Sequence, residues 1–416
     1  MKRTALMPWL LGACLACAAT PSEPSDDLTD STTDTLEAEA VSAAWPEDRR
    51  TPRRTGYNPY EATITRATAP TLHIDWRAPV AGHHLALGAG LLFVSGDTSG
   101  SVSALHPDSG AVAWTQPGPF VGPGAATRGS YTIGTGDARM AVLNAKTGNV
   151  ERYFYGELGA DPRVTPPLTS DGFVTFESDS YFEECVPHDA GEICESRRTV
   201  GFVSSYNVHG AERFRAYLPF GIGVPARAGD RIFVVGSDLS LLGSDVAAIS
   251  AVDGSLLWQS EHAWESGAAP LHPPAVLHGR VFALVGSNWL RVHDEHDGRL
   301  LWEYRTQSDI NSLIVSDASV FLLSGPDALG LHLEVLAPDM GTLVRSTTVS
   351  ATRVTGEFIA TRELLLGGVD DRLMILDART LDIVSTLSLG GSVGSPVLVD
   401  GRLYIGNGTQ ILGLTP

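Results

Sequence analysis

Positive charge is scarce in this sequence. The 416 residues include 29 Lys and Arg against 48 Asp and Glu, which gives a net charge of −19 at pH 7. A surface with this charge repels nucleic acid and anionic lipid headgroups, and no basic patch with interleaved aromatic residues offsets it. We therefore expect no nucleic acid among the partners of this protein.

Motifs of nucleotide-dependent and hydrolytic enzymes are also lacking. There is no P-loop and no dinucleotide-binding motif. Residues 390–394 match the G-x-S-x-G pattern, but this pattern indicates a nucleophile only between a strand and a helix, and here it falls between two predicted strands. The cluster His293-Asp294-Glu295-His296-Asp297 coincides with an Asp-Gly hairpin, so we interpret it as a solvated turn rather than a metal site. The sequence predicts no catalytic residue and no metal ligand.

The N-terminal apolar segment is too short to cross a membrane. Ala5–Ala13 follows a basic start and contains Pro8 and Gly12, which fits a signal-peptide core rather than a spanning helix of roughly 20 residues. Residues 11–14, Leu-Gly-Ala-Cys, resemble a bacterial lipobox, in which the cysteine becomes the lipidated first residue.

Cys14 is therefore the predicted lipidation site, and Cys17 is a poorer alternative because Cys14 stands three residues before it. The competing interpretation is an ordinary secretory signal with incidental cysteines. Neither cysteine is followed by Asp, and the resemblance then points to the outer membrane. We take residues 1–19 as the signal peptide and lipobox region.

Residues 20–44 have few large aliphatic side chains and are rich in Ser, Thr, Pro, Asp and Glu. Such a segment cannot bury enough apolar surface to offset its ordering entropy. We expect a disordered tether that separates the membrane surface from a folded body at 45–416.

The stretch Pro274–Tyr304 shows the unit from which the body is built. Four short apolar or alternating runs are separated by His278-Gly279, by Gly286-Ser287-Asn288 and by Asp297-Gly298. Runs of this length between glycines and Asx residues are typical of antiparallel strands joined by tight hairpins. The unit is predicted to be a four-stranded meander.

Turn glycines recur through the body at a regular spacing. Successive members differ by 38, 62, 44, 44 and 43 residues: Gly110, Gly148, Gly210, Gly254, Gly298 and Gly341. A period near 40 is typical of β-propeller blades. The last unit lacks its outermost strand, which Leu72–Ala78 can supply. The sequence therefore predicts an all-β, eight-bladed propeller closed by pairing of its N- and C-terminal strands, with seven blades as the alternative count.

An insertion at 178–198 interrupts the repeat and contains Cys185 and Cys194. In an exported protein, two such cysteines indicate a disulfide that closes a short hairpin. A metal site that uses both cysteines and His188 is an alternative without a recognised spacing. The hairpin is either a recognition loop or a decoration without a partner.

The repeats resemble the pyrroloquinoline-quinone-type (PQQ-like) repeat. The similarity is carried by residues 395–406, 143–148 and 376–380, and residues 45–59, with their clustered arginines, resemble the lead-in of such proteins. We interpret this lead-in as a strap across the propeller rather than a functional basic patch. The resemblance implies a propeller from about Trp45 onward and one of two functions: a quinoprotein dehydrogenase, or a scaffold of the BamB type in outer-membrane assembly.

The quinoprotein branch typically has adjacent cysteines over the quinone, a tryptophan beneath it and carboxylates on calcium. This chain has four cysteines and no adjacent pair. Three tryptophans recur in one slot of their repeats, and with Trp76 they are assigned to packing between blades: Trp114, Trp258 and Trp302.

We therefore expect a monomeric, non-catalytic scaffold without a cofactor. It is expected to bind an unidentified envelope protein and to reach the membrane only through its lipid anchor. The predicted location is the outer membrane, facing the periplasm or the cell surface. The alternatives are a PQQ- and calcium-dependent oxidoreductase and a propeller that binds carbohydrate or another small ligand.

Overall fold

The computed structural model describes part of a compact unit that extends from Ser42 to Pro416. The described residues are 45, 49–96, 100–126, 129–136, 139–155, 168–169, 172–182, 185–188, 191–194, 197–207, 211–238, 243–263 and 272–416. The predicted signal peptide and tether, with Cys14 and Cys17, lie outside these residues. Over the described residues the fold is all β apart from the 3-10 helix η1 (Ala69–Thr71), and none of their helices is long and apolar enough to cross a membrane.

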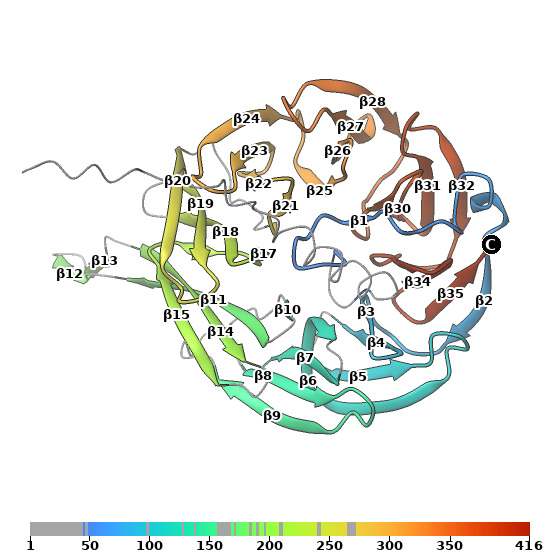
Figure 1. The fold of residues 1–416 in the computed structure, drawn as a ribbon, viewed down its shortest axis with the longest axis horizontal. Coiled ribbons are helices and arrows are strands. Elements are labelled where there is room, and N and C mark those ends of the chain that lie inside the picture. Colours follow the sequence, from blue (N-terminus) through green and yellow to red (C-terminus); the bar gives the residue numbers. More distant parts are fainter. Residues whose placement is uncertain are drawn as a thin grey trace, which may run out of the picture. The chain divides into compact units, whose positions relative to one another are not determined.

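The strands form sheets that follow one another around a common centre, with strands such as β17 (Ala226–Ala228), β21 (Ala275–Leu277), β25 (Ile310–Val315) and β1 (Tyr57–Asn58) nearest to that centre (Figure 1). In the first half of the chain one sheet contains β3 (His84–Gly88), β4 (Leu91–Ser95), β5 (Gly100–Leu105), β6 (Val112–Ala126), β7 (Ser130–Thr135), β8 (Arg139–Asn144) and β9 (Val150–Tyr155). The next contains β10 (Leu168–Thr169), β11 (Gly172–Phe182), β14 (Arg197–Asn207) and β15 (Glu212–Leu218), and a separate hairpin pairs β12 (Cys185–His188) with β13 (Gly191–Cys194).

Five more sheets complete the described body. The first contains β16 (Gly221–Ile222), β17 (Ala226–Ala228), β18 (Arg231–Asp238), β19 (Gly243–Ser250) and β20 (Leu256–Ala263). The next two are β21 (Ala275–Leu277), β22 (Arg280–Val285), β23 (Trp289–Asp294) and β24 (Leu300–Arg305), and then β25 (Ile310–Val315), β26 (Val320–Asp327), β27 (Gly330–Leu336) and β28 (Leu343–Val349). In the fourth, β1 (Tyr57–Asn58) adds to β29 (Ile359–Thr361), β30 (Leu364–Val369), β31 (Arg372–Asp377) and β32 (Ile383–Ser388).

The fifth of these sheets joins the two ends of the folded body. Its strands β33 (Val397–Val399), β34 (Arg402–Gly406) and β35 (Ile411–Thr415) are consecutive, and its outermost strand is β2 (His73–Ala78). Strand β2 pairs antiparallel with β35, His73 opposite Thr415 and Ala78 opposite Ile411. One strand from early in the sequence therefore completes the last sheet.

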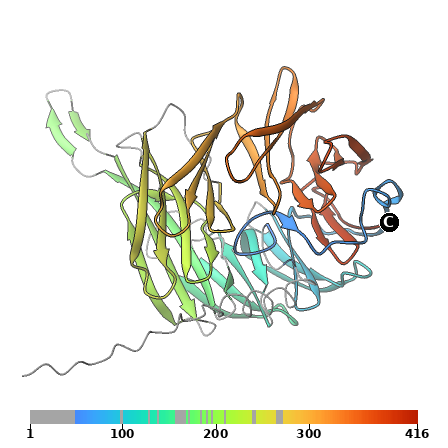
Figure 2. The ribbon, with the colours of Figure 1, turned by 45° about the horizontal axis from the view of Figure 1, so that its top comes forward.

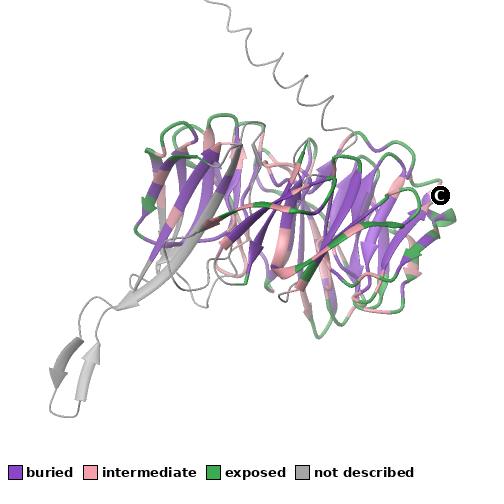
Figure 3. Cartoon of the chain, turned by 90° about the horizontal axis from the view of Figure 1, so that it is seen from below, coloured by how far each residue is buried: buried purple, intermediate pink, exposed green. Residues whose placement is uncertain are grey.

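Burial explains the two hydrophobic patterns seen in the repeat. The second strand β22 is buried on both faces from Val281 to Val285, because side chains of the neighbouring sheets cover it on either side. The outermost strand β24 alternates, with Trp302 buried and its neighbour Glu303 exposed. Figure 3 shows the same trend, with buried residues concentrated in the inner strands. A continuous apolar run therefore marks a strand between two sheets.

Neighbouring sheets are joined through a tryptophan and a glycine turn. Trp258 on β20 packs on Gly298 in the β23–β24 turn, where an added Cβ would lie 2.5 Å from the indole ring. The indole N–H of Trp258 also donates to the carbonyl of Glu295 at 3.0 Å. The other sequence-predicted tryptophans make the same pair of contacts: Trp76 with Gly110 and Pro107, Trp114 with Gly148 and Ala145, and Trp302 with Gly341 and Pro338.

Replacing the turn glycine should loosen the joint between two sheets. Gly298 has φ +72 and no room for a Cβ, whereas Gly279 has φ +71 and nothing within 4 Å of that position. We expect Gly298→Ala to lower the free energy of unfolding by about 2–4 kcal/mol, because backbone strain adds to overlap with Trp258. Gly279→Ala, the matched control, should cost only the strain of about 1 kcal/mol. Denaturant unfolding of both variants tests this, and equal losses would contradict the packing argument.

The β12–β13 hairpin brings its two cysteines opposite each other in the backbone register, Cys185 with Cys194. Opposed residues of an antiparallel pair have Cα atoms about 4.5–5.5 Å apart, within the range that a disulfide spans. The disulfide remains a prediction.

Protein exported to an oxidising compartment should show one disulfide-linked peptide by mass spectrometry. Cys185→Ser should cost about 2–3 kcal/mol of stability; two free thiols in the exported protein would contradict the assignment.

Candidate functional site

The most distinctive feature near the centre is a segment that crosses the inner strands. We call residues 49–61, together with Trp45, the axial strap. Its middle part includes β1, which lies among the innermost strands in the first view and between the sheets in the tilted one (Figures 1 and 2). The strap pairs in parallel with β29, Tyr57 opposite Ala360 and Asn58 opposite Thr361. The other pairings between described strands are antiparallel.

Successive residues of the strap bind the inner strands of successive sheets. The backbone carbonyl groups accept hydrogen bonds of 2.8–2.9 Å from four strands: Pro52 from Arg227 of β17, Arg53 from Val276 of β21, Thr55 from Val315 of β25 and Gly56 from Ala360 of β29. The Asn58 amide then donates to Leu398 of β33 at 2.8 Å. At the other end, Trp45 exchanges two backbone hydrogen bonds with Leu87 of β3. One short segment thus connects six sheets.

Three buried arginines fix the strap from within. Arg49, Arg50 and Arg54 are each at most 4% exposed. Arg54 donates from Nε to the Pro225 carbonyl at 2.7 Å, and Arg49 donates to the Leu313 carbonyl at 2.8 Å. Burial lowers the pKa of Arg50 to about 10, so this side chain keeps its charge at neutral pH.

The backbone of these arginines is strained. Their φ angles are +59, +76 and +53, in the left-handed region that costs a residue with a Cβ about 1–2 kcal/mol. The segment would not favour this conformation alone. The hydrogen bonds to the inner strands therefore impose it.

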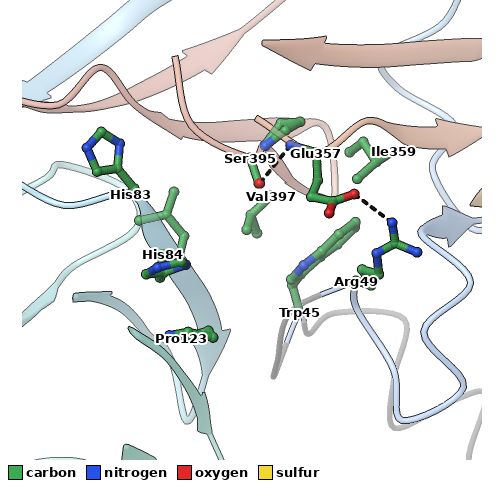
Figure 4. Close-up of a pocket in the computed structure, with 11 residues that line it drawn as sticks. Trp45, Arg49, His83, His84, Pro123, Glu357, Ile359, Ser395 and Val397 are labelled. Atoms are coloured by element: carbon green, nitrogen blue, oxygen red, sulfur yellow. Dashed lines mark hydrogen bonds and ion pairs between the residues drawn. The ribbon is translucent and has the colours of Figure 1, made fainter. Parts of the chain in front are cut away.

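Glu357, in the loop before β29, is the acidic partner of the strap. Its carboxylate accepts hydrogen bonds from Arg49 at 2.6 Å and from the Ser312 hydroxyl at 3.1 Å, and its N–H donates to Ser395 (Figure 4). Burial alone would raise the pKa of this carboxyl group, but Arg49, His272 and the hydrogen bonds outweigh it and hold the pKa below its usual value of 4.5. Glu357 is thus ionised and neutralised at pH 7.

An open depression of about 380 Å³ lies beside this ion pair. Its lining residues lie near the starts of inner strands. Figure 4 shows His83 and His84 on one side of the depression, with Glu357 and Ser395 across from them. Trp45 and Arg49 line a small adjoining cavity of about 20 Å³, room for at most one water molecule. The depression offers hydrogen-bond donors and acceptors; among its lining residues Thr355 has a buried hydroxyl without a hydrogen-bond partner.

The described lining residues do not fit a PQQ and calcium site. Calcium takes six to eight oxygen ligands, whereas the one carboxylate of this lining, Glu357, is already bound to Arg49. Trp45 is only 2% exposed and faces a cavity far smaller than a tricyclic quinone. Within the described residues, no group of three or more His, Cys, Asp and Glu is placed to hold a metal ion.

The residues singled out in the sequence lie elsewhere. The four slot tryptophans lie on the outermost strands of their units and none of them lines the depression. His293 is buried, and its Nδ1 is 2.9 Å from the Gly298 carbonyl, while Asp294 accepts hydrogen bonds from the turn. Ser392 lines the depression but follows strand β32 and precedes strand β33, so it is not in a nucleophile elbow.

Sequence reasoning missed the acidic partner of the arginines. Clustered arginines at 49–54 gave a signal, but Glu357 lies 308 residues away from Arg49 and nothing in its local sequence marks it. His83 and His84 likewise carry no motif.

The chain belongs to the family whose model is described as outer membrane protein assembly factor BamB, which matches residues 61–175 and 199–414. The two matched segments leave out the whole insertion at 178–198, which contains both body cysteines. The protein is therefore a PQQ-like repeat β-propeller. A comparison with curated protein sequences finds no match.

Solved structures with the same fold include dehydrogenases and a BamB protein. Quinohemoprotein alcohol dehydrogenase from Comamonas testosteroni is 13% identical with a TM-score of 0.70, over 92% of this chain and 82% of that one. A europium-containing methanol dehydrogenase is 12% identical with a TM-score of 0.73, over 92% and 100%. BamB from Moraxella catarrhalis is 16% identical with a TM-score of 0.57, over 83% and 98%. At these identities the likeness shows the fold alone.

The ion pair beneath the depression should make stability depend on pH. Because the folded-state pKa of Glu357 lies below its value of 4.5 in the unfolded chain, ionised Glu357 stabilises the fold above about pH 4.5, and this contribution is lost as pH falls through the folded-state pKa. We expect Glu357→Gln to cost on the order of 2 kcal/mol at pH 7, since Arg49 is left buried without its carboxylate. Thermal unfolding from pH 3 to 8 should show the two proteins converging in acid; a constant difference would contradict this role.

Proposed function

We propose that this protein is a non-catalytic, eight-bladed propeller scaffold at the cell envelope that binds a protein partner. The observation that carries the proposal is the axial strap, which occupies the region where the inner strands of a propeller converge. Membership of the assembly-factor family supports the same function. Rigid loops on the faces of the ring would present the binding surface.

Eight blades follow from dividing the seven-stranded sheet at β6. The first half of this 15-residue strand pairs with β5 and its second half pairs with β7. Each half then serves one four-stranded unit, and the sheet that contains β2 and β35 is the eighth. We propose that this last sheet closes the ring.

A lipid anchor at Cys14, with Cys17 as the alternative, would hold the scaffold at the outer membrane. The proposed partner is an envelope protein that takes part in outer-membrane protein assembly, as the family description suggests. The proposed scaffold is a monomer.

A quinoprotein oxidoreductase is the second candidate, favoured by the structural likeness to two dehydrogenases. The paired carboxylate of Glu357 and the position of Trp45 argue against it. Titration calorimetry of the purified protein with PQQ and Ca²⁺ separates the candidates. We expect no heat of binding at micromolar concentrations. Stoichiometric tight binding would overturn the scaffold proposal and call for dye-linked assays of alcohol and sugar oxidation.

The partner can be sought with the anchored protein in its own membrane. Photo-crosslinking residues placed on exposed loops of either face should give discrete adducts with an outer-membrane assembly component, and adducts should map to one face. The purified component should then bind the purified propeller in a titration. Absence of any adduct from both faces would contradict a scaffold role in assembly.

A further inference from the structure

The axial strap is attached to the sheets in the way that a bound peptide is attached to its receptor. Each inner strand from β17 to β33 pairs with its second strand on one side, so its other edge is open to an added segment. The strap supplies that segment, with backbone carbonyl groups directed at inner-strand N–H groups on β17, β21, β25 and β29. Addition of an extended peptide to open strand edges is a common mode of peptide recognition.

Side chains of the strap add selectivity to these backbone contacts. Arg54 donates to the carbonyl of Pro225. Arg49, five residues earlier in the sequence, donates to the carbonyl of Leu313. Asn58 donates to Leu398, and the Glu61 carboxylate accepts the N–H of Gly401 at 3.0 Å. A segment with these residues at these spacings satisfies groups on three different sheets. A neutral or acidic segment would leave the carbonyl groups and Glu357 without donors.

The connection between the strap and the first strand of the ring contains both buried and exposed residues. Ile64 and Ala69 lie in the hydrophobic core, whereas Arg66 and Ala67 between them are exposed. Arg66 makes an ion pair with Asp377 while its own side chain is 58% exposed. The chain is thus accessible between Arg66 and Ala67.

We propose that the open edges of the inner strands form a peptide-binding site for an arginine-containing segment, and that the axial strap of this chain is its resident ligand. The site retains the segment after the chain is cut between strap and ring, and it exchanges the segment for an added peptide of the same sequence. This inference does not rest on the scaffold function, because the contacts between the strap and the inner strands do not depend on what the ring binds elsewhere.

A cleavable full-length chain tests the proposal. A specific protease site is inserted between Arg66 and Ala67, a fluorophore is attached ahead of Trp45, and the cut protein is passed through gel filtration. We expect the labelled fragment to elute with the ring. Loss of the fragment during gel filtration overturns the proposal, whether or not the remaining ring stays folded.

Competition with synthetic peptides tests the selectivity without any folding variant. Unlabelled peptide 45–61 in excess should displace the labelled fragment from the cut protein. The same peptide with Arg54→Ala should compete about tenfold or more weakly, because it lacks a charged hydrogen bond to a buried carbonyl. The control peptide with Tyr60→Phe should compete as the natural sequence does, since this ring is 46% exposed. Equal competition by all three peptides overturns the assigned recognition.

Discussion

The inner edges of the sheets impose the main constraint on this fold. A strand edge near the centre of a propeller has N–H and C=O groups that water reaches poorly, and buried backbone groups require partners. The axial strap meets this requirement for several sheets at once, with one residue for each strand in turn. The cost is a strained backbone at Arg49, Arg50 and Arg54, which only the combined contacts of the segment can offset.

At the outer edges a different device joins the sheets, and it is not uniform. On β28, Arg345 stands at the position that Trp302 has on β24. In the backbone register Arg345 lies opposite Val335, as Trp302 lies opposite Val292. In the next sheet, the turn position of Gly341 is taken by Leu381, still at positive φ. There the N-terminal segment contributes directly: Arg66 binds Asp377 beside that turn, and its N–H binds Glu363. The start of the folded body thus adds contacts to the sheet whose turn lacks the glycine.

The sequence was informative wherever the signal is local. Hairpin glycines, apolar second strands and recurring tryptophans depend on neighbours within one repeat, and they predicted an all-β repeat fold of the PQQ-like family, which the family match confirms. The repeat period also assigned Trp258 and Gly298 to defined positions in their repeats, although the sequence alone does not show that these two residues are in contact. The candidate site was not predictable in the same way. Its ion pair joins Arg49 to Glu357, and only the path of the strap across the ring brings these two residues together.

The same strap bears on the choice between a scaffold and an oxidoreductase. Both kinds of protein share this fold, so the sheets cannot distinguish them, and the difference must lie in what occupies the centre. Here Arg49 neutralises Glu357, the carboxylate of the depression, which removes the charge that would attract a divalent cation. The ion pair that secures the strap is therefore incompatible with cation binding by the same carboxylate.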